Sequence, residues 1–329
     1  MLLACLAAAG CAGSGPDATD AADGTPQVIE RERLQMGTRF HIQLVSDDKT
    51  AANAALDAAF AEVDRVEALL SEWRDSSEIS AVNRAAGGSP VPVGPELLHV
   101  VERSVHFSEI TNGAFDISFA GCGRLWSFRE PRIPDAATIR DCLESVDYRG
   151  IDLDREHATI RLAASKTRIG IAGIGKGYGV DRAAEVLEAH GFTDYIIDGG
   201  GDIRLRGKRI DRPWSVGIAH PRQPGTLFGR LRLDRGSIVT SGDYQRSFER
   251  DGEVYHHILD PATGLPARLS IAVTVVAENA TDADALATGL FVLGPEKGIE
   301  LVESLDDVEA LIIGPEMSVH RSSGFPVTE

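Results

Sequence analysis

Asp284 and Thr288 carry oxygen atoms at a spacing that suits the binding of one metal ion. They belong to the segment Thr281–Thr288, which reads TDADALAT. Residues four apart on a helix lie on the same face, and a carboxylate beside a hydroxyl can bind a hard cation such as Mg²⁺. The same letters also fit a capping box, in which Thr281 and Asp284 bind backbone N–H groups at the start of a helix. The spacing leaves both interpretations open.

A glycine-rich segment, Gly170–Asp181, reads GIAGIGKGYGVD. Its glycines let a ligand approach the backbone closely, so that N–H groups or a carbonyl oxygen can face it. The segment does not match the P-loop, because Gly177 follows Lys176 where that motif requires Ser or Thr. The alternative is a tight strand-to-helix turn that binds nothing.

The segment Tyr255–Gly264 reads YHHILDPATG and holds two adjacent histidines. The Asp-Pro-x-Thr-Gly letters are typical of a turn. Neighbouring residues on a strand point to opposite faces. At most one of His256 and His257 can therefore serve a given site.

The elements that must position these segments can be predicted from hydrophobic periodicity. Helices are expected at about 50–71, 95–110 and 281–293, and another follows the glycine-rich segment and ends near Gly191. Strand-like runs occur at 40–45, 195–197, 238–240 and 271–276. The order is neither a strict βαβ alternation nor an all-β rhythm, so we expect an α+β fold.

The composition limits the classes of function. The chain has 329 residues, of which 43% are hydrophobic, and a formal net charge of −17. This charge argues against nucleic acid as a partner, because phosphate backbones favour clustered Lys and Arg. An anionic substrate must then be bound locally, by a metal, a helix N-terminus or a few cations. The sequence contains no run of about 20 apolar residues, so no membrane-spanning helix is expected.

The N-terminal residues MLLACLAAAGC resemble the end of a bacterial lipoprotein signal peptide. On this interpretation residues 1–10 are removed, Cys11 carries the lipid, residues 11–27 form a flexible tether, and 28–329 form the folded domain. The protein would be exported and anchored to the membrane, facing the periplasm or the cell surface. An ordinary signal peptide, or an N-terminus without any signal, is the alternative.

Four cysteines are present. Cleavage would remove Cys5, and acylation would use Cys11. Cys122 and Cys142 remain, and they could pair in an oxidising compartment. We expect two buried free thiols instead, since a buried Cys behaves as a small apolar residue.

Taken together, these segments resemble the ApbE family of flavin transferases, which move FMN from FAD onto a Ser or Thr of a target protein. The resemblance covers nearly all of residues 34–305, in the order of the family's motifs. The motifs are Met36-Gly37-Thr38, the stretch from Ser71 to Asn83, Gly113–Asp116 with Leu125-Trp126 after it, GIGKGYGVD, GGGDI (Gly199–Ile203), TSGDY (Thr240–Tyr244), HILDPATG (His257–Gly264) and ADALAT (Ala283–Thr288).

The resemblance implies an α+β fold of the T-fold-related, ApbE-like kind, with a larger and a smaller lobe enclosing an FAD cleft. It implies a Mg²⁺ ion, with Mn²⁺ as an alternative, held by the carbonyl of Gly173 and the side chains of Asp284 and Thr288. The residues that match FAD-contacting positions are Met36, Trp73, Ala114, Phe115, Asp116, Lys176, His257 and Ile258.

The implied reaction is attack by the acceptor hydroxyl on the FMN-side phosphorus of FAD, with AMP as the leaving group. The metal and Lys176 would neutralise the developing charge, and His257 is expected to take the hydroxyl proton. Asp243 and Asp260 are the competing candidates for the base. The acceptor would be a redox protein. The alternatives are an FAD pyrophosphatase that uses water, and a flavin-binding lipoprotein without catalysis.

Overall fold

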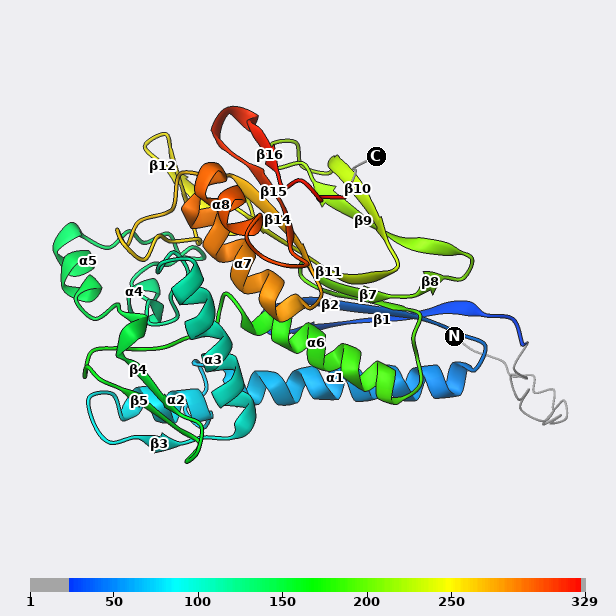
Figure 1. The fold of residues 1–329 in the computed structure, drawn as a ribbon, viewed down its shortest axis with the longest axis horizontal. Coiled ribbons are helices and arrows are strands. Elements are labelled where there is room, and N and C mark those ends of the chain that lie inside the picture. Colours follow the sequence, from blue (N-terminus) through cyan, green and yellow to red (C-terminus); the bar gives the residue numbers. More distant parts are fainter. Residues whose placement is uncertain (1–23, 327–329) are drawn as a thin grey trace, which may run out of the picture.

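The structure is a computed structural model that describes residues 24–326. The expected signal peptide, Cys11 and the tether up to residue 23 lie outside these residues. The first strand begins at Gln27, one residue before the expected start of the folded domain. The remaining chain forms two lobes (Figure 1).

An antiparallel sheet of eight strands forms the larger lobe, in the order β1-β2-β6-β7-β11-β14-β15-β16. Its strands are β1 (Gln27–Gln35), β2 (Thr38–Ser46), β6 (Tyr195–Gly199), β7 (Asp202–Arg206), β11 (Arg235–Gly242), β14 (Ala272–Ala277), β15 (Glu309–Ile313) and β16 (Val319–Arg321). The four expected strands fall in or overlap β2, β6, β11 and β14, because alternating or continuous apolar runs fit a sheet with a buried face.

The two faces of this sheet are covered differently (Figure 1). Helices α1 (Lys49–Leu70), α6 (Gly175–Ala189), α7 (Ala280–Leu293) and α8 (Pro295–Val302) pack on one face. A smaller sheet packs on the other, and its strands are β8 (Lys208–Arg209), β9 (Arg212–Ala219) and β10 (Leu227–Leu233). Its buried Trp214 and Leu231 share a core with Leu205 and Ile238 of the large sheet.

The helices form where the sequence predicts them. Asp48 caps α1 by accepting from the N–H groups of Thr50 and Ala51, which satisfies donors that a helix leaves unpaired. Helix α3 (Pro95–Ile110) begins with Pro95, whose missing N–H is harmless in the first turn. Among the described helices none is both long and apolar enough to cross a bilayer.

The smaller lobe holds α3 with α2 (Glu78–Arg84), α4 (Ala120–Gly123) and α5 (Ala136–Leu143), beside a sheet of β3 (Val91–Pro92), β5 (Thr159–Leu162) and β4 (Ile151–Asp154). A hairpin of β12 (Ser247–Arg250) and β13 (Glu253–His256) extends from the larger lobe. The α+β prediction is therefore confirmed.

The prediction of two free thiols is wrong. Cys122 of α4 and Cys142 of α5 form a disulfide, with their Cα atoms 5.6 Å apart. The packing of α5 beside α4 brings these Cα atoms into the range that a disulfide requires. Sequence spacing alone carries no information about that packing, which is why the pairing was not predicted.

Candidate functional site

Two adjoining pockets lie where the start of α6, the start of α7 and the smaller lobe meet. The first, here called the Phe115 pocket, has a volume of about 400 Å³. The second, here called the Met36 pocket, has a volume of about 860 Å³. They share part of their walls, so one elongated ligand can occupy both. The shared residues are Glu72, Trp73, Ala172, Lys176, Gln245, Arg246 and His257.

Every residue predicted for the site lines at least one of these pockets. The Phe115 pocket is lined by Trp73, Ala114, Phe115, Asp116, Gly173, Lys176, His257, Ile258, Asp284 and Thr288. Met36 lines the Met36 pocket, together with Trp73, Lys176 and His257. The structure thus brings together residues that are spread over some 250 positions of the sequence. Their individual roles stay predictions.

The N-terminal ends of α6 and α7 touch backbone to backbone. A Cβ atom at Gly177 would lie only 2.1 Å from the carbonyl oxygen of Ala280, so this position admits no side chain without moving a helix. The N–H of Gly177 donates to Oδ2 of Asp284 at 3.2 Å. The glycine-rich segment therefore fixes the orientation of the Asp284 carboxylate.

The capping-box interpretation of Thr281 and Asp284 is wrong. The N-cap of α7 is Asn279, whose side chain accepts from the N–H of Asp282. Thr281 donates its hydroxyl to Asp181 of α6. Asp284 is left to point into the Phe115 pocket, where its side chain is almost fully buried.

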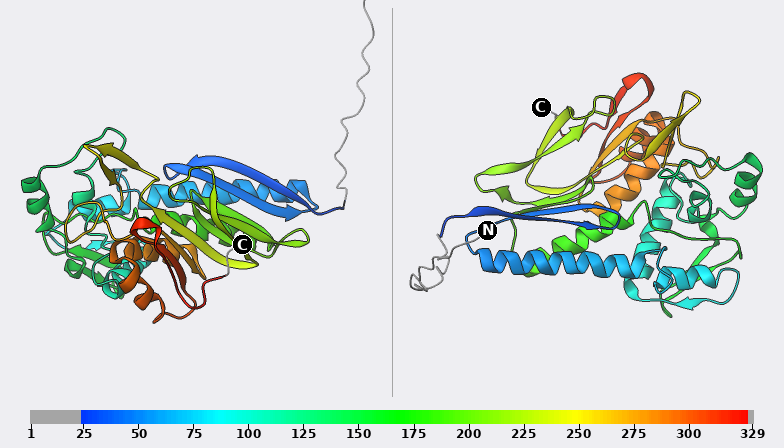
Figure 2. Two further views of the ribbon diagram at one scale, coloured as in Figure 1. Left: turned by 90° about the horizontal axis from the view of Figure 1, so that it is seen from above. Right: turned by 180° about the vertical axis from the view of Figure 1, so that it is seen from behind.

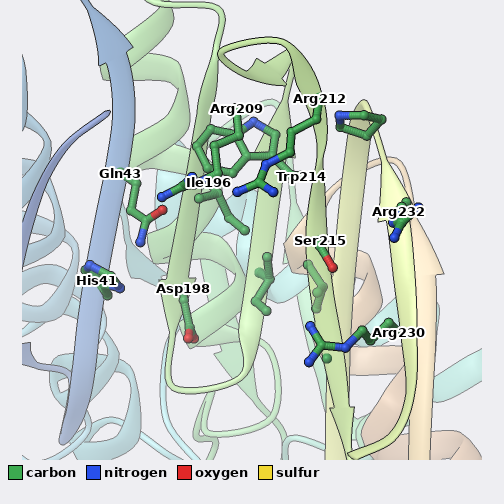
Figure 3. A pocket seen from close by; sticks show the side chains of 14 residues that line it. His41, Gln43, Ile196, Asp198, Arg209, Arg212, Trp214, Ser215, Arg230 and Arg232 are labelled. Atoms are coloured by element: carbon green, nitrogen blue, oxygen red, sulfur yellow. The ribbon is translucent and has the colours of Figure 1, made fainter. Parts of the chain in front are cut away.

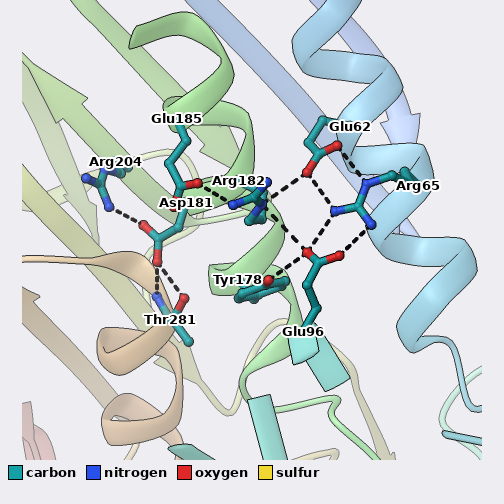
Figure 4. A network of polar contacts seen from close by, with 9 residues as sticks. All are labelled: Glu62, Arg65, Glu96, Tyr178, Asp181, Arg182, Glu185, Arg204 and Thr281. Atoms are coloured by element: carbon teal, nitrogen blue, oxygen red, sulfur yellow. Dashed lines mark hydrogen bonds and ion pairs between the residues drawn. The ribbon is translucent and has the colours of Figure 1, made fainter. Parts of the chain in front are cut away.

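A network of polar contacts holds α6 against its neighbours (Figure 4). The Asp181 carboxylate accepts from the N–H groups of Ala280 and Thr281 and from Arg204. On the other side of α6, Arg182 pairs with Glu62 of α1, and Tyr178 donates to Glu96 of α3. The helix that carries Lys176 is thereby tied to α1, α3 and α7. These contacts make the glycine-rich segment rigid at its helical end.

Lys176 lies between two buried carboxylates. Its Nζ atom is 2.5 Å from Oδ2 of Asp202 and 3.7 Å from Oδ1 of Asp284. Burial opposes the charged form of Lys176, but the two carboxylates outweigh it and raise its pKa. Burial also raises the pKa of Asp202 well above its usual range, and the neighbouring Asp284 raises it further. The two carboxyl groups thus compete for one ammonium, and a further cation beside them would favour the ionised form of both.

The groups around Asp284 fit a hard divalent cation. A Cβ atom placed on Gly173 would lie 3.2 Å from Oγ1 of Thr288 and 3.1 Å from the Phe115 ring, so the Gly173 main chain approaches the Thr288 hydroxyl closely. That hydroxyl has no hydrogen-bond partner among the described residues. A carboxylate, a hydroxyl and a main-chain carbonyl are the oxygen donors that Mg²⁺ prefers. No cluster of three His, Cys, Asp or Glu side chains with metal-binding geometry occurs within residues 24–326, so such a site depends on the carbonyl and hydroxyl.

The side chains of the two adjacent histidines lie in different surroundings, and only one of them faces the pockets, as predicted. The buried His256 hydrogen-bonds the carbonyl of Ala267 through Nε2 and packs edge-on against Phe291. His257 instead lines both pockets, and its buried Nδ1 has no hydrogen-bond partner. Burial, helped by the charge of Arg246, lowers the pKa of His257 to about 4. At neutral pH its ring is therefore uncharged and able to accept a proton.

The competing candidates for the base are engaged elsewhere. The Asp243 carboxylate makes two hydrogen bonds to the guanidinium of Arg222, each of 2.7 Å. Asp260 accepts from the N–H of Ala262 and the hydroxyl of Thr263, which stabilises the Asp-Pro-x-Thr-Gly turn. Neither residue lines the Phe115 pocket or the Met36 pocket. Of the three candidates, His257 alone faces the site.

Two of the predicted flavin-contacting residues have distinct surroundings. The Asp116 carboxylate accepts from Ser118 and from the N–H of Tyr148, so it shapes the turn that carries Phe115. Trp73 is 73% exposed, and the guanidinium of Arg124 lies 4.6 Å from its ring centre. Its aromatic face at the pocket mouth suits stacking, the role that the sequence indicates.

Sequence reasoning missed Asp202 and Arg246. Asp202 lies in the GGGDI motif and Arg246 follows TSGDY by two residues, and no role was assigned to either. Both line the Phe115 pocket. The position of Asp202 directly after a glycine run was a signal in the sequence. Its contact with Lys176 could not be predicted, because the two residues lie 26 positions apart.

The fold has a long antiparallel sheet, and a buried Lys–Asp cluster lies between its two lobes. Both features are found in a protein that is similar to flavin transferases. The profile of the ApbE family matches residues 36–312, and the chain belongs to this family. An FAD:protein FMN transferase of Treponema pallidum is 35% identical over 317 residues, covering 90% of this chain and 87% of the relative. One from Haemophilus influenzae is 30% identical over 303 residues, covering 87% of each.

Solved structures of ApbE proteins have the same fold as this chain. The crystal structure of the ApbE protein from Thermotoga maritima superposes with a TM-score of 0.83 at 30% identity, covering 91% of this chain and 98% of that one. The flavin transferase ApbE from Vibrio cholerae superposes with a TM-score of 0.82 at 26% identity, covering 92% and 99%. The described chain therefore has the complete fold of these proteins.

Proposed function

We propose that this enzyme transfers FMN from FAD to a Ser or Thr hydroxyl of an acceptor protein, forming a phosphoester and releasing AMP. Family membership and the names of the relatives support transfer from FAD to a protein. The observation that carries the proposal for this chain is the position of Lys176, which lies beside Asp284 at the wall shared by the two pockets. One dinucleotide can span both pockets with its diphosphate at this wall.

We further propose that Gly173, Asp284 and Thr288 hold one Mg²⁺ ion, or Mn²⁺ in its place. When bound, this ion would offset the negative charge of the diphosphate and of the leaving AMP. Lys176 contributes a second positive charge at the same wall, and Asp202 holds its ammonium there by a hydrogen bond. Charge compensation by fixed groups of this kind typically contributes a few kcal/mol to lowering a barrier.

His257 accepts the proton of the acceptor hydroxyl in this proposal. Its ring is uncharged at neutral pH, its Nδ1 is unpartnered, and it lines both pockets. Binding of the anionic diphosphate nearby would raise the pKa of the ring, because a negative charge stabilises the imidazolium. The ring would thus become a stronger base once FAD is bound.

The test is mass spectrometry of candidate exported redox proteins after incubation with this enzyme, FAD and Mg²⁺. We expect FMN attached to a Ser or Thr, with AMP released in equal amount. If FMN and AMP appear freely without acceptor and no protein is modified, the enzyme is a pyrophosphatase that uses the same residues. If FAD is recovered unchanged with acceptor and Mg²⁺ present, the protein only binds flavin.

We also propose that the enzyme is exported and held at the membrane by a lipid on Cys11, facing the periplasm or cell surface. The disulfide between Cys122 and Cys142 supports export, because such bonds persist in oxidising compartments and are rare in the cytosol. Labelling cells with a radioactive fatty acid tests the anchor. Loss of label in a Cys11→Ser variant is expected, and retention of label would reject Cys11 as the lipid site.

A further inference from the structure

A second cleft, of about 820 Å³, lies on the face of the large sheet opposite to the helices (Figure 3). Strands β2, β6 and β7 form one wall, and the smaller sheet of β8, β9 and β10 forms the other. It shares no lining residue with the Phe115 or Met36 pocket. It therefore needs an explanation other than catalysis.

The cleft is basic although the protein is acidic. Four arginines line it, namely Arg209, Arg212, Arg230 and Arg232, against one carboxylate, Asp198. The segment 203–235, which supplies the smaller sheet, holds nine Lys or Arg and two Asp, a net charge of +7 in a chain of −17. Such a local concentration of one charge creates a positive potential that attracts anions.

Three of these arginines have no acidic partner in the part of the chain that the structure describes. Arg209, Arg212 and Arg230 make no ion pair with any residue in the range 24–326. Arg204, Arg206 and Arg222 of the same segment are each paired, with Asp181, Glu188 and Asp243 respectively. The Asp198 carboxylate accepts from the N–H of Gly201, so part of its capacity is used within its own turn. The unpaired guanidinium groups are thus available to an external anion.

An exposed apolar side chain stands beside these charges. Ile210 joins β8 to β9, is 51% exposed and has a φ of +66°. A positive φ is unfavourable for a β-branched residue. Lys208, Arg209 and Arg212 lie within two residues of it in sequence, and one acidic residue, Asp211, follows it directly. An exposed apolar side chain in a mainly basic segment is typical of regions that contact an anionic membrane surface.

The position of the turn between β8 and β9 agrees with such a contact. The described chain starts at the same end of the molecule, where β1 leads into the sheet and β8 turns into β9 (Figures 1 and 2). Gln43 of β2 lines the basic cleft, and Gln27, the first residue of β1, pairs with Ser46 three residues further along β2. A lipid on Cys11 would thus attach to the chain 16 residues before the strand at this end.

We propose that the cleft of Arg209, Arg212 and Arg230, together with the Ile210 tip, docks on the phosphate headgroups of an anionic phospholipid bilayer. Guanidinium groups bind phosphate oxygens in a bidentate manner, and anionic membrane surfaces attract clustered Arg and Lys. Docking at this end leaves α4 and α5 toward the opposite end (Figure 1). Ala120 and Gly123 of α4 line the Phe115 pocket, so this pocket stays accessible to an acceptor protein.

The test uses the full chain with Cys11→Ser, which has no acylation site, and sedimentation with vesicles. We expect binding to phosphatidylcholine vesicles that contain phosphatidylglycerol, weakening with added salt, and little binding to phosphatidylcholine alone. Arg212→Glu with Arg230→Glu should lower the partition coefficient by about tenfold or more. The control Arg140→Glu with Lys297→Glu changes the net charge equally at exposed positions outside the cleft, and should retain binding.

Four results would overturn the proposal. Equal binding to both kinds of vesicle would show that anionic headgroups are not recognised. An equal loss of vesicle binding in the control variant would show that binding depends on the overall charge and not on the cleft. If Arg212→Glu with Arg230→Glu instead slows FMN transfer to an acceptor in free solution, with an unchanged melting temperature, the cleft binds the acceptor protein. Saturable binding of inorganic phosphate, measured by calorimetry and sufficient to displace vesicles, would assign the cleft to a soluble anion.

Discussion

The ammonium nitrogen of Lys176 lies 3.7 Å from Oδ1 of Asp284. One residue can face a phosphate and the other a cation, and their separation is set where the ends of α6 and α7 touch. Asp284 also accepts from the N–H of Gly177, the residue after Lys176.

Replacing Asp284 by Ala should abolish FMN transfer at ordinary Mg²⁺ concentrations. The substitution removes the proposed metal's carboxylate ligand and leaves Thr288 and a carbonyl as weak neutral ligands. Transfer to an acceptor protein is measured by its covalent flavin fluorescence. Asp282→Asn, on the same helix but paired with Arg103, is the control and should stay active. Full activity of Asp284→Ala would remove this residue from the metal site.

Replacing His257 by Ala should slow transfer by roughly 10²–10⁴-fold, because the proton acceptor is lost. FAD should still bind, since the other residues that line the two pockets remain. Single-turnover rates and an FAD titration, each with the variant, separate the two effects. His256→Gln is the matched control, because His256 faces away and binds Ala267. It should transfer at nearly the parent rate, although it is expected to unfold at a lower temperature. An unchanged rate in His257→Ala would exclude His257 as the base.

Replacing Asp202 by Asn should raise the Mg²⁺ concentration needed for half-maximal transfer by about tenfold, equivalent to about 1.4 kcal/mol. The Lys176 ammonium then loses its nearest carboxylate and pairs more strongly with Asp284, where it competes with the metal. A Mg²⁺ titration at saturating FAD measures this shift. Asp198→Asn, in the neighbouring turn but outside both pockets, should leave the titration unchanged. The idea fails if Asp202→Asn needs no more Mg²⁺ than the parent.

His257 should make the folded protein less stable as the pH falls. Burial lowers its pKa from 6.5 to about 4, so between these values the unfolded chain binds a proton that the folded chain rejects. The free energy of unfolding therefore decreases as the pH falls from about 6.5 to about 4, by up to about 3 kcal/mol from this group. Urea unfolding at several pH values should show a smaller decrease for His257→Gln. Parallel curves for parent and variant would contradict the assignment.

Replacing both Cys122 and Cys142 by Ala should lower the free energy of unfolding by about 3 kcal/mol. The disulfide closes a loop of 20 residues and restricts the unfolded chain. Urea unfolding without reductant measures the loss, and the parent treated with reductant should match the variant. Equal stability of the oxidised and reduced parent would show that the bond adds nothing.

The fold was largely predictable because its elements have strong local patterns. The apolar stripe of α1, Pro95 at the start of α3 and the glycine after α6 each act within a few residues. The motifs likewise indicated which residues gather at the site. The contacts of Lys176 with Asp202 and of Thr281 with Asp181 could not be predicted, because they depend on how α6 packs against β7 and α7. The disulfide between α4 and α5 was missed for the same reason.

The absence of a larger side chain at Gly177 has a consequence for how this enzyme can evolve. Even a methyl group there would collide with the Ala280 carbonyl and push the two helices apart, which would widen the gap between Lys176 and Asp284. Mutational drift at this position is thus constrained by the contact between the two helices, although Gly177 carries no side chain. Engineering that aims to admit bulkier nucleotides has to begin at the mouth, around Trp73, and leave this helix junction intact.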